Sequence, residues 1–86
     1  DRAYEASGDL TPRTMEGAVI ALDEDRVRQA VQIASTEYVT TRTGETIALP
    51  VRTICVHGDT PGALASARAI RDALLQAGIS ITAVEP

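Results

Sequence analysis

The residues best suited to chemistry lie in one short segment, residues 55–61, which reads CVHGDTP and holds the only histidine and the only cysteine. The imidazole of His57 exchanges a proton near neutral pH. A free Asp59 carboxylate beside it could orient the ring, share a proton with it, or bind a metal with it. A metal site needs more ligands than this segment offers, so the sequence leaves metal binding open. We take His57 and Asp59 as the candidate catalytic pair.

Each of these residues also has a structural interpretation. An aspartate in a turn commonly accepts hydrogen bonds from nearby backbone N–H groups. Free cysteines are among the most buried residues, so Cys55 is expected to be a small packing residue rather than a nucleophile. For His57, the local chemistry does not separate a functional role from a structural one.

A second group of candidates lies in residues 1–22, which show no sustained periodicity and are expected to be mostly irregular. Arg2 and Arg13 could each clamp a carboxylate or a phosphate through two hydrogen bonds. The structural alternative is a surface ion pair, such as Arg2 with Glu5, which would contribute little. From local residues alone, the ion pair is the favoured interpretation.

The C-terminal part of the chain has the pattern of a right-handed β-α-β unit. Residues 52–56 resemble a buried strand, and residues 79–84 alternate between apolar and polar types. Between them, the Thr-Pro pair at 60–61 suits a helix start, and Gly78 suits the end of a helix over residues 61–77. The candidate pair would then lie between a strand end and a helix N-terminus, where α/β folds place sites.

The middle of the chain predicts one helix and one small β-hairpin. Asp23 suits the N-cap of the helix, and an apolar face follows at helical spacing with Arg26 and Arg28 outside it. Two β-type runs, residues 38–42 and 46–49, then flank a glycine-containing turn.

The composition predicts that this chain is a piece of a larger fold. The chain has 86 residues, room for one small domain, with fourteen Ala, two Tyr and no Phe or Trp. Such a light apolar set is expected to pack against further structure, and the isolated chain is expected to be unstable. Net charge is −4, which argues against nucleic-acid binding, and no apolar run approaches a membrane span. One cysteine excludes an internal disulfide and fits a reducing, cytoplasmic setting.

Two blocks of sequence resemble the LamB/YcsF family. Residues 1–4 (DRAY), 8–13 (GDLTPR) and 16–20 (EGAVI) are similar to its DR-x-Y…G-x-L-x-x-R…GA stretch, and residues 54–61 (ICVHGDTP) to its C-terminal CVHGDTP signature. The resemblance implies an α/β fold, the C-terminal part of a distorted, TIM-like β/α barrel. A complete barrel takes about 250 residues, so residues 1–86 would be the C-terminal fragment of a single barrel domain.

The resemblance also implies an activity, the ATP-dependent hydrolysis of the lactam 5-oxoproline to glutamate. ATP, with Mg²⁺, and two partner subunits, B and C, are implied, and a homo-oligomer is compatible with this. His57 and Asp59 would move protons, while Arg2, Tyr4 and Arg13 would hold a carboxylate or phosphate, with both arginines in the cleft of His57. The Asp/Asn- and His-rich motifs from the N-terminal part of the family are not in this chain. The alternatives are a metal-dependent, deacetylase-like amide hydrolase on the same barrel and a non-catalytic regulatory or scaffold subunit.

Overall fold

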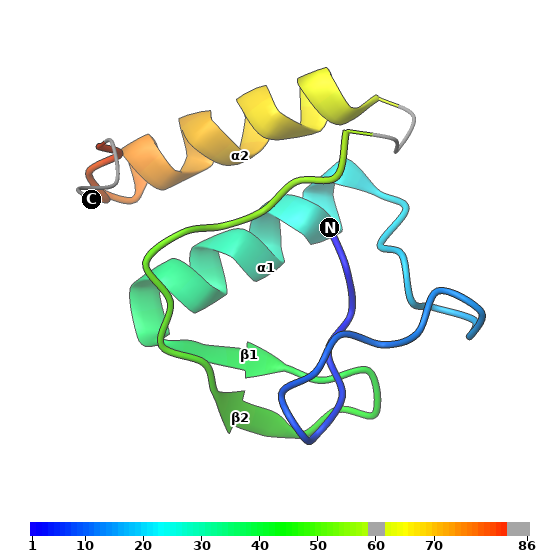
Figure 1. The fold of residues 1–86 in the computed structure, drawn as a ribbon. Coiled ribbons are helices and arrows are strands. Elements are labelled where there is room, and N and C mark those ends of the chain that lie inside the picture. The colour runs from blue at the N-terminus through cyan, green and yellow to red at the C-terminus, as the bar shows by residue number, and fades with distance from the viewer. Residues whose placement is uncertain (59–61, 83–86) are drawn as a thin grey trace.

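The computed structural model describes residues 1–58 and 62–82. Two helices lie one above the other, and a small hairpin packs on the far side of the first helix (Figure 1). No helix in the described ranges is long and apolar enough to cross a membrane. The elements, in chain order, are α1 (Asp23–Thr36), β1 (Tyr38–Thr40), β2 (Thr46–Ala48) and α2 (Ala63–Gln76).

Helix α1 begins at Asp23, one residue earlier than predicted. The N-cap is Leu22, in an extended conformation and without a capping side chain, so the prediction of Asp23 as N-cap is wrong. The Asp23 carboxylate instead accepts a hydrogen bond from the Ser66 hydroxyl of α2, at 2.5 Å. The helix ends at Thr36, and its C-cap is Glu37, which has a positive φ of 62° and whose N–H donates to the Ile33 carbonyl.

The predicted hairpin is confirmed, with shorter strands. β1 and β2 pair antiparallel, and Val39, which is completely buried, lies opposite Ile47. Gly44 has a φ of 97° in the turn, a conformation that glycine adopts without strain. The Thr41 hydroxyl donates to the Glu45 carboxylate at 2.8 Å, which closes the turn with a side-chain bond.

Helix α2 begins at Ala63 with Gly62 as its N-cap, two residues after the predicted start. Thr60 and Pro61, the predicted N-cap and first helical residue, lie outside the described residues. The predicted end is confirmed: the N–H groups of Gly78 and Ile79 donate to the carbonyls of Leu75 and Leu74, both at 3.0 Å. These two bonds form a Schellman motif.

The two strands predicted around α2 are not present in the described part of the chain. Residues 52–56 and 79–82 belong to no strand, and residues 83–84 lie outside the described ranges. A strand exists through ladder bonds to a neighbour, and no described segment pairs with either run. The described residues therefore form a small mixed helix-and-strand unit, in which neither the predicted β-α-β unit nor a barrel is seen.

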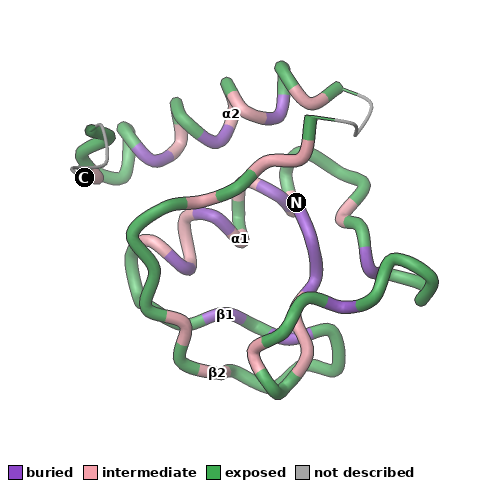
Figure 2. The backbone as a smooth tube through the Cα atoms, viewed as in Figure 1, coloured by how far each residue is buried: buried purple, intermediate pink, exposed green. Residues whose placement is uncertain are grey.

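The apolar core lies between the two helices. Buried positions of α1 and α2 face each other (Figure 2), and Ala30, Ile70 and Leu74 form the buried cluster. Residues 54 and 56, on the segment that leads to α2, pack against it. The apolar face predicted for α1 from periodicity is therefore the face that meets α2.

One buried contact between the helices is polar. Arg26, predicted to lie outside the apolar face, is only 5% exposed. Its guanidinium donates to the Ser66 hydroxyl at 2.7 Å and to the Ile20 carbonyl, and lies 3.5 Å from the Asp23 carboxylate. A long side chain next to an apolar stripe can reach such partners, which periodicity alone does not reveal.

Candidate functional site

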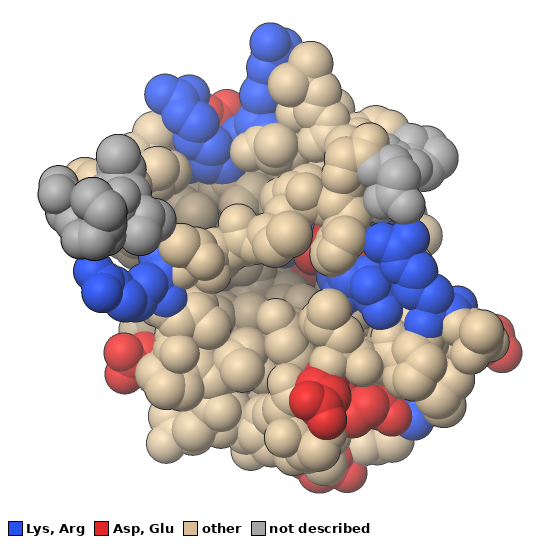
Figure 3. Space-filling model, viewed as in Figure 1, with Lys and Arg blue, Asp and Glu red and all other residues tan. Residues whose placement is uncertain are grey.

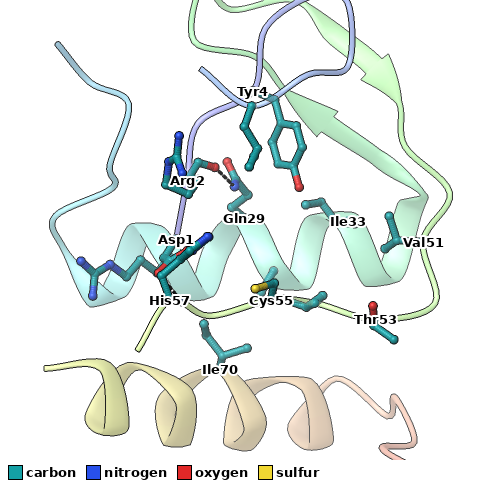
Figure 4. Close-up of a pocket in the computed structure, with 14 residues that line it drawn as sticks. Asp1, Arg2, Tyr4, Gln29, Ile33, Val51, Thr53, Cys55, His57 and Ile70 are labelled. Atoms are coloured by element: carbon teal, nitrogen blue, oxygen red, sulfur yellow. Dashed lines mark hydrogen bonds and ion pairs between the residues drawn. The ribbon is translucent and has the colours of Figure 1, made fainter. Parts of the chain in front are cut away.

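A cavity of about 160 Å³ lies beside His57. Its walls come from the N-terminal segment, from α1, from residues 51–57 and, through Ile70, from α2 (Figure 4). Its polar lining includes Asp1, Arg2, Tyr4, Gln29, Cys55 and His57. Apolar walls with a few convergent polar groups are typical of small-molecule sites.

His57 is held by the carboxylate of Asp1. The ring Nδ1 lies 2.8 Å from Asp1 Oδ1, and the backbone N–H of His57 donates to Asp1 Oδ2 at 2.9 Å. The Asp1 side chain is 1% exposed, whereas that of His57 is 27% exposed. Because an ionised carboxylate only accepts hydrogen bonds, Nδ1 carries a proton. In the neutral ring, Nε2 is then the nitrogen that can accept a proton.

The N-terminal segment is fixed by bonds to two other parts of the chain. The Ile20 N–H donates to the Asp1 carbonyl at 3.0 Å, and the Ala3 N–H donates to the Ala18 carbonyl at 2.9 Å. From α1, the Gln29 side chain donates to the Arg2 carbonyl at 2.8 Å. The apolar run at 18–20 thus provides the backbone partners that place Asp1 next to His57.

Sequence reasoning selected His57 but missed Asp1 as its partner. The two residues are 56 positions apart, so no local spacing connects them. The only available signal was the place of Asp1 in the DR-x-Y block. Asp59, the predicted partner, lies outside the described residues, and its pairing with His57 stays a prediction.

Arg2 is buried, at 9% exposure, and bonds to backbone rather than to a carboxylate. Its Nη2 donates to the Thr11 carbonyl at 2.6 Å, and its Nε donates to the Ala18 carbonyl at 3.4 Å. The alternative of an ion pair with Glu5 is wrong, because Glu5 pairs with Arg42. Arg2 lines the cavity, but its guanidinium is already partly engaged.

Glu5 and Arg42 join the N-terminal segment to the hairpin turn. Two guanidinium nitrogens of Arg42 donate to the two Glu5 oxygens at 2.8 and 2.9 Å. The Arg42 bonds, and after them the Thr11 hydroxyl, hold the pKa of Glu5 below its usual value. This pair is peripheral to the cavity, and its role is structural.

The other two candidates for ligand binding lie in different places. Tyr4 is half-buried and lines the cavity, with its ring near Gln29 and Ile33 (Figure 4). Arg13 is exposed and is not among the described residues that line the cavity. Of the three candidates, Arg2 and Tyr4 line the cavity of His57. The place of Arg13 in the same cleft of the complete protein stays a prediction.

Cys55 is exposed, so the prediction that it is a buried packing residue is wrong. It lies on residues 52–56, the predicted strand to which no described segment pairs, and it lines the cavity.

Within residues 1–58 and 62–82, no group of three or more His, Cys, Asp or Glu side chains could hold a metal ion. The cavity beside His57, at about 160 Å³, is smaller than the ~300 Å³ at which pockets for drug-sized ligands begin.

Comparisons with known proteins agree with the resemblance in the sequence. The LamB/YcsF family profile matches residues 1–86. The A subunit of 5-oxoprolinase from Streptomyces griseus is 47% identical over 83 residues, covering 96% of this chain and 33% of that protein. The A subunit of 5-oxoprolinase from Tolumonas auensis is 43% identical over 84 residues, covering 98% and 34%.

A solved structure supports the same assignment. The crystal structure of the lactam utilization protein from Thermus thermophilus matches with a TM-score of 0.88 and 38% identity, over 96% of this chain and 32% of that one. The chain thus spans about a third of the length of the relatives it matches. With the family profile covering every residue, the chain belongs to the LamB/YcsF family.

Proposed function

We propose that this chain is part of the A subunit of a 5-oxoprolinase, a hydrolase that opens the lactam of 5-oxo-L-proline to L-glutamate. The names of the relatives support the reaction. Because the chain spans about a third of those relatives, the rest of the protein is expected to supply further site residues. ATP with Mg²⁺, two partner subunits, B and C, and a cytoplasmic location belong to the same proposal.

The observation that carries the proposal is His57 on the wall of a small cavity, with its Nδ1 bound by a buried carboxylate. A cavity of ~150 Å³ is known to hold benzene, so a five-membered lactam suits a cavity of about 160 Å³. Opening the lactam adds the oxygen of water to the carbonyl carbon and breaks the C–N bond. The departing nitrogen needs a proton to become the amine of glutamate.

His57 is suited to move that proton. Its Nε2 can take a proton from the attacking water, and the resulting imidazolium can deliver one to the departing nitrogen. Arg2 and Tyr4 line the same cavity and are the candidates to hold the substrate carboxylate. Asp59 remains a second candidate for proton transfer, and Arg13 a candidate for binding carboxylate or phosphate.

The test uses the complete A subunit with its partner subunits, measuring glutamate formation with and without ATP. The His57→Gln variant is expected to lower turnover roughly 10²–10⁴-fold, since that is the usual contribution of general acid–base groups. Arg28→Gln is the matched control, because Arg28 is exposed and pairs only locally with Asp25. Melting temperatures of both variants separate lost chemistry from lost folding.

Other outcomes point to the two alternatives. Near-wild-type turnover by a folded His57→Gln variant would remove His57 from the mechanism. Hydrolysis that proceeds at the same rate without ATP but is abolished by a metal chelator would indicate the metal-dependent amide hydrolase. An assembled complex that keeps its activity without the A subunit would indicate the regulatory or scaffold role.

A further inference from the structure

We infer that Asp1 is a positioning residue for His57, which fixes the tautomer and the direction of the imidazole so that Nε2 is the reactive nitrogen. This inference rests on the proposed function and deepens it. It adds a residue that sequence reasoning did not assign a role, and it gives a reason why a carboxylate is buried at this cavity.

The geometry of Asp1 is the first argument. Its two oxygens bond to two different N–H groups of the same residue: Oδ1 to the ring of His57 at 2.8 Å and Oδ2 to the backbone at 2.9 Å. The backbone and the ring of His57 are therefore both held by the Asp1 carboxylate. A bond to the backbone alone would anchor the segment, whereas the bond to the ring also sets its orientation and protonation.

Burial is the second argument. The Asp1 side chain is 1% exposed, and removing a carboxylate from water is costly unless it is paired and hydrogen-bonded. The partly exposed imidazole and this buried carboxylate both line the cavity. A neighbouring carboxylate also stabilises the imidazolium that forms when Nε2 takes up a proton.

Asparagine at position 1 separates this role from a purely structural one. Its amide oxygen could still accept the backbone N–H of His57, so the anchoring bond can persist. Its NH₂ group would face Nδ1 as a donor, which forces the ring into the tautomer with the proton on Nε2. A general base in that tautomer has no free nitrogen toward the cavity. In a comparable Asp–His arrangement, such a change lowers kcat ~10⁴-fold.

The experiment compares Asp1→Asn with wild type in the complete A subunit with its partners. We expect kcat to fall roughly 10²–10⁴-fold and KM to change little. The double variant with His57→Gln should be little worse than the worse single variant, because groups that act as a unit are not additive. Asp9→Asn is the matched control, since Asp9 is exposed on the same segment.

Two results would overturn the inference. The first is a folded Asp1→Asn variant with kcat close to wild type, which would make Asp1 structural. The second comes from the wild-type protein, so it does not depend on the variant folding. Nitrogen-15 NMR of the histidine rings, with His57 assigned by the His57→Gln variant, should show the proton on Nδ1, and a proton on Nε2 would refute the role. If the wild-type complex formed no glutamate, the proposed function would be wrong. The NMR measurement would still test whether Asp1 sets the tautomer of His57.

Discussion

Asp1 and Arg2 are adjacent in the chain, yet their side chains serve opposite sides of the N-terminal segment. Asp1 reaches His57, and Arg2 bonds to the carbonyls of Thr11 and Ala18. In extended backbone, successive side chains point to opposite faces, which accounts for this division. Both side chains line the cavity, but Asp1 holds His57 there, whereas Arg2 also holds the backbone of Thr11 and Ala18.

Glu5 provides a prediction at the scale of a single residue. Because Arg42 and Thr11 lower its pKa in the folded state, the ionised carboxylate stabilises the fold above the ordinary glutamate value of 4.5. That stabilisation is lost as the pH falls through the lowered pKa. Glu5→Gln should therefore destabilise the complete A subunit near neutral pH, and its deficit relative to wild type should shrink in acid.

Urea unfolding midpoints measured from about pH 6 down to about pH 3 would check this. Glu16→Gln is the control, because the Glu16 side chain is exposed. A deficit that stays constant over the whole range would show that the Glu5–Arg42 pair does not act through ionisation.

Sequence reasoning reached part of the residue-scale description. His57 was identifiable because a histidine in a strand–turn–helix pattern marks a common place for sites. Asp1 was not, because its contact spans 56 positions and depends on the path of an irregular segment. Arg2 and Tyr4 were found only through the family block. No local signal in the sequence distinguishes an arginine that bonds to backbone carbonyls from an arginine that binds a ligand.

At the scale of elements, α1 and α2 are joined by apolar packing and by the buried contact of Arg26 and Ser66. Ser66 is completely buried; its hydroxyl accepts from Arg26 at 2.7 Å and donates to Asp23. Removing it leaves a buried guanidinium nitrogen without that acceptor. Ser66→Ala should therefore lower the stability of the complete A subunit by about 1–3 kcal/mol.

Ser35→Ala on the exposed part of α1 is the matched control for this prediction. Chemical denaturation of both variants, with the slope of the transition unchanged, gives the comparison. Equal stability of the Ser66→Ala variant and wild type would mean that the polar contact adds nothing beyond the apolar core.

The elements also show what periodicity can and cannot predict. The two helices and the hairpin were predictable because their patterns and turns are local, and Gly78 marked the end of α2 correctly. The runs at 52–56 and 79–84 carry strand-like patterns, but a strand also requires a partner. No described segment supplies one, so the pattern indicates a preference that the described residues do not satisfy.

At the scale of the whole molecule, the chain exposes surface that a self-sufficient domain would cover. Its accessible surface is 5746 Å², whereas a compact monomer of 9.1 kDa is expected to expose roughly 4,900 Å². The space-filling view shows a face that is hollowed between its upper and lower parts, with arginines at the edges (Figure 3). A second groove, of about 480 Å³, runs beside α2 and residues 51–56. Apolar side chains line much of it: Val51, Ile54, Val56, Ala67, Ile70, Leu74, Ile79 and Ile81.

We therefore expect the isolated chain of residues 1–86 to lack a cooperative thermal transition as a monomer and to bind a dye that reports exposed apolar surface. The core between the helices is a small cluster of Ala30, Ile70 and Leu74 with its partly buried neighbours, and no large aromatic side chain contributes to it. The burial of such a small core contributes little free energy to offset the conformational entropy that the chain loses on folding. In a protein as long as the relatives, the further residues are expected to cover the groove and to pair with residues 52–56. Circular dichroism melting and light scattering on the isolated chain, with the complete protein as control, would test this. A single sharp transition of a monomeric chain, coincident by two probes, would show instead that these residues fold as an independent domain.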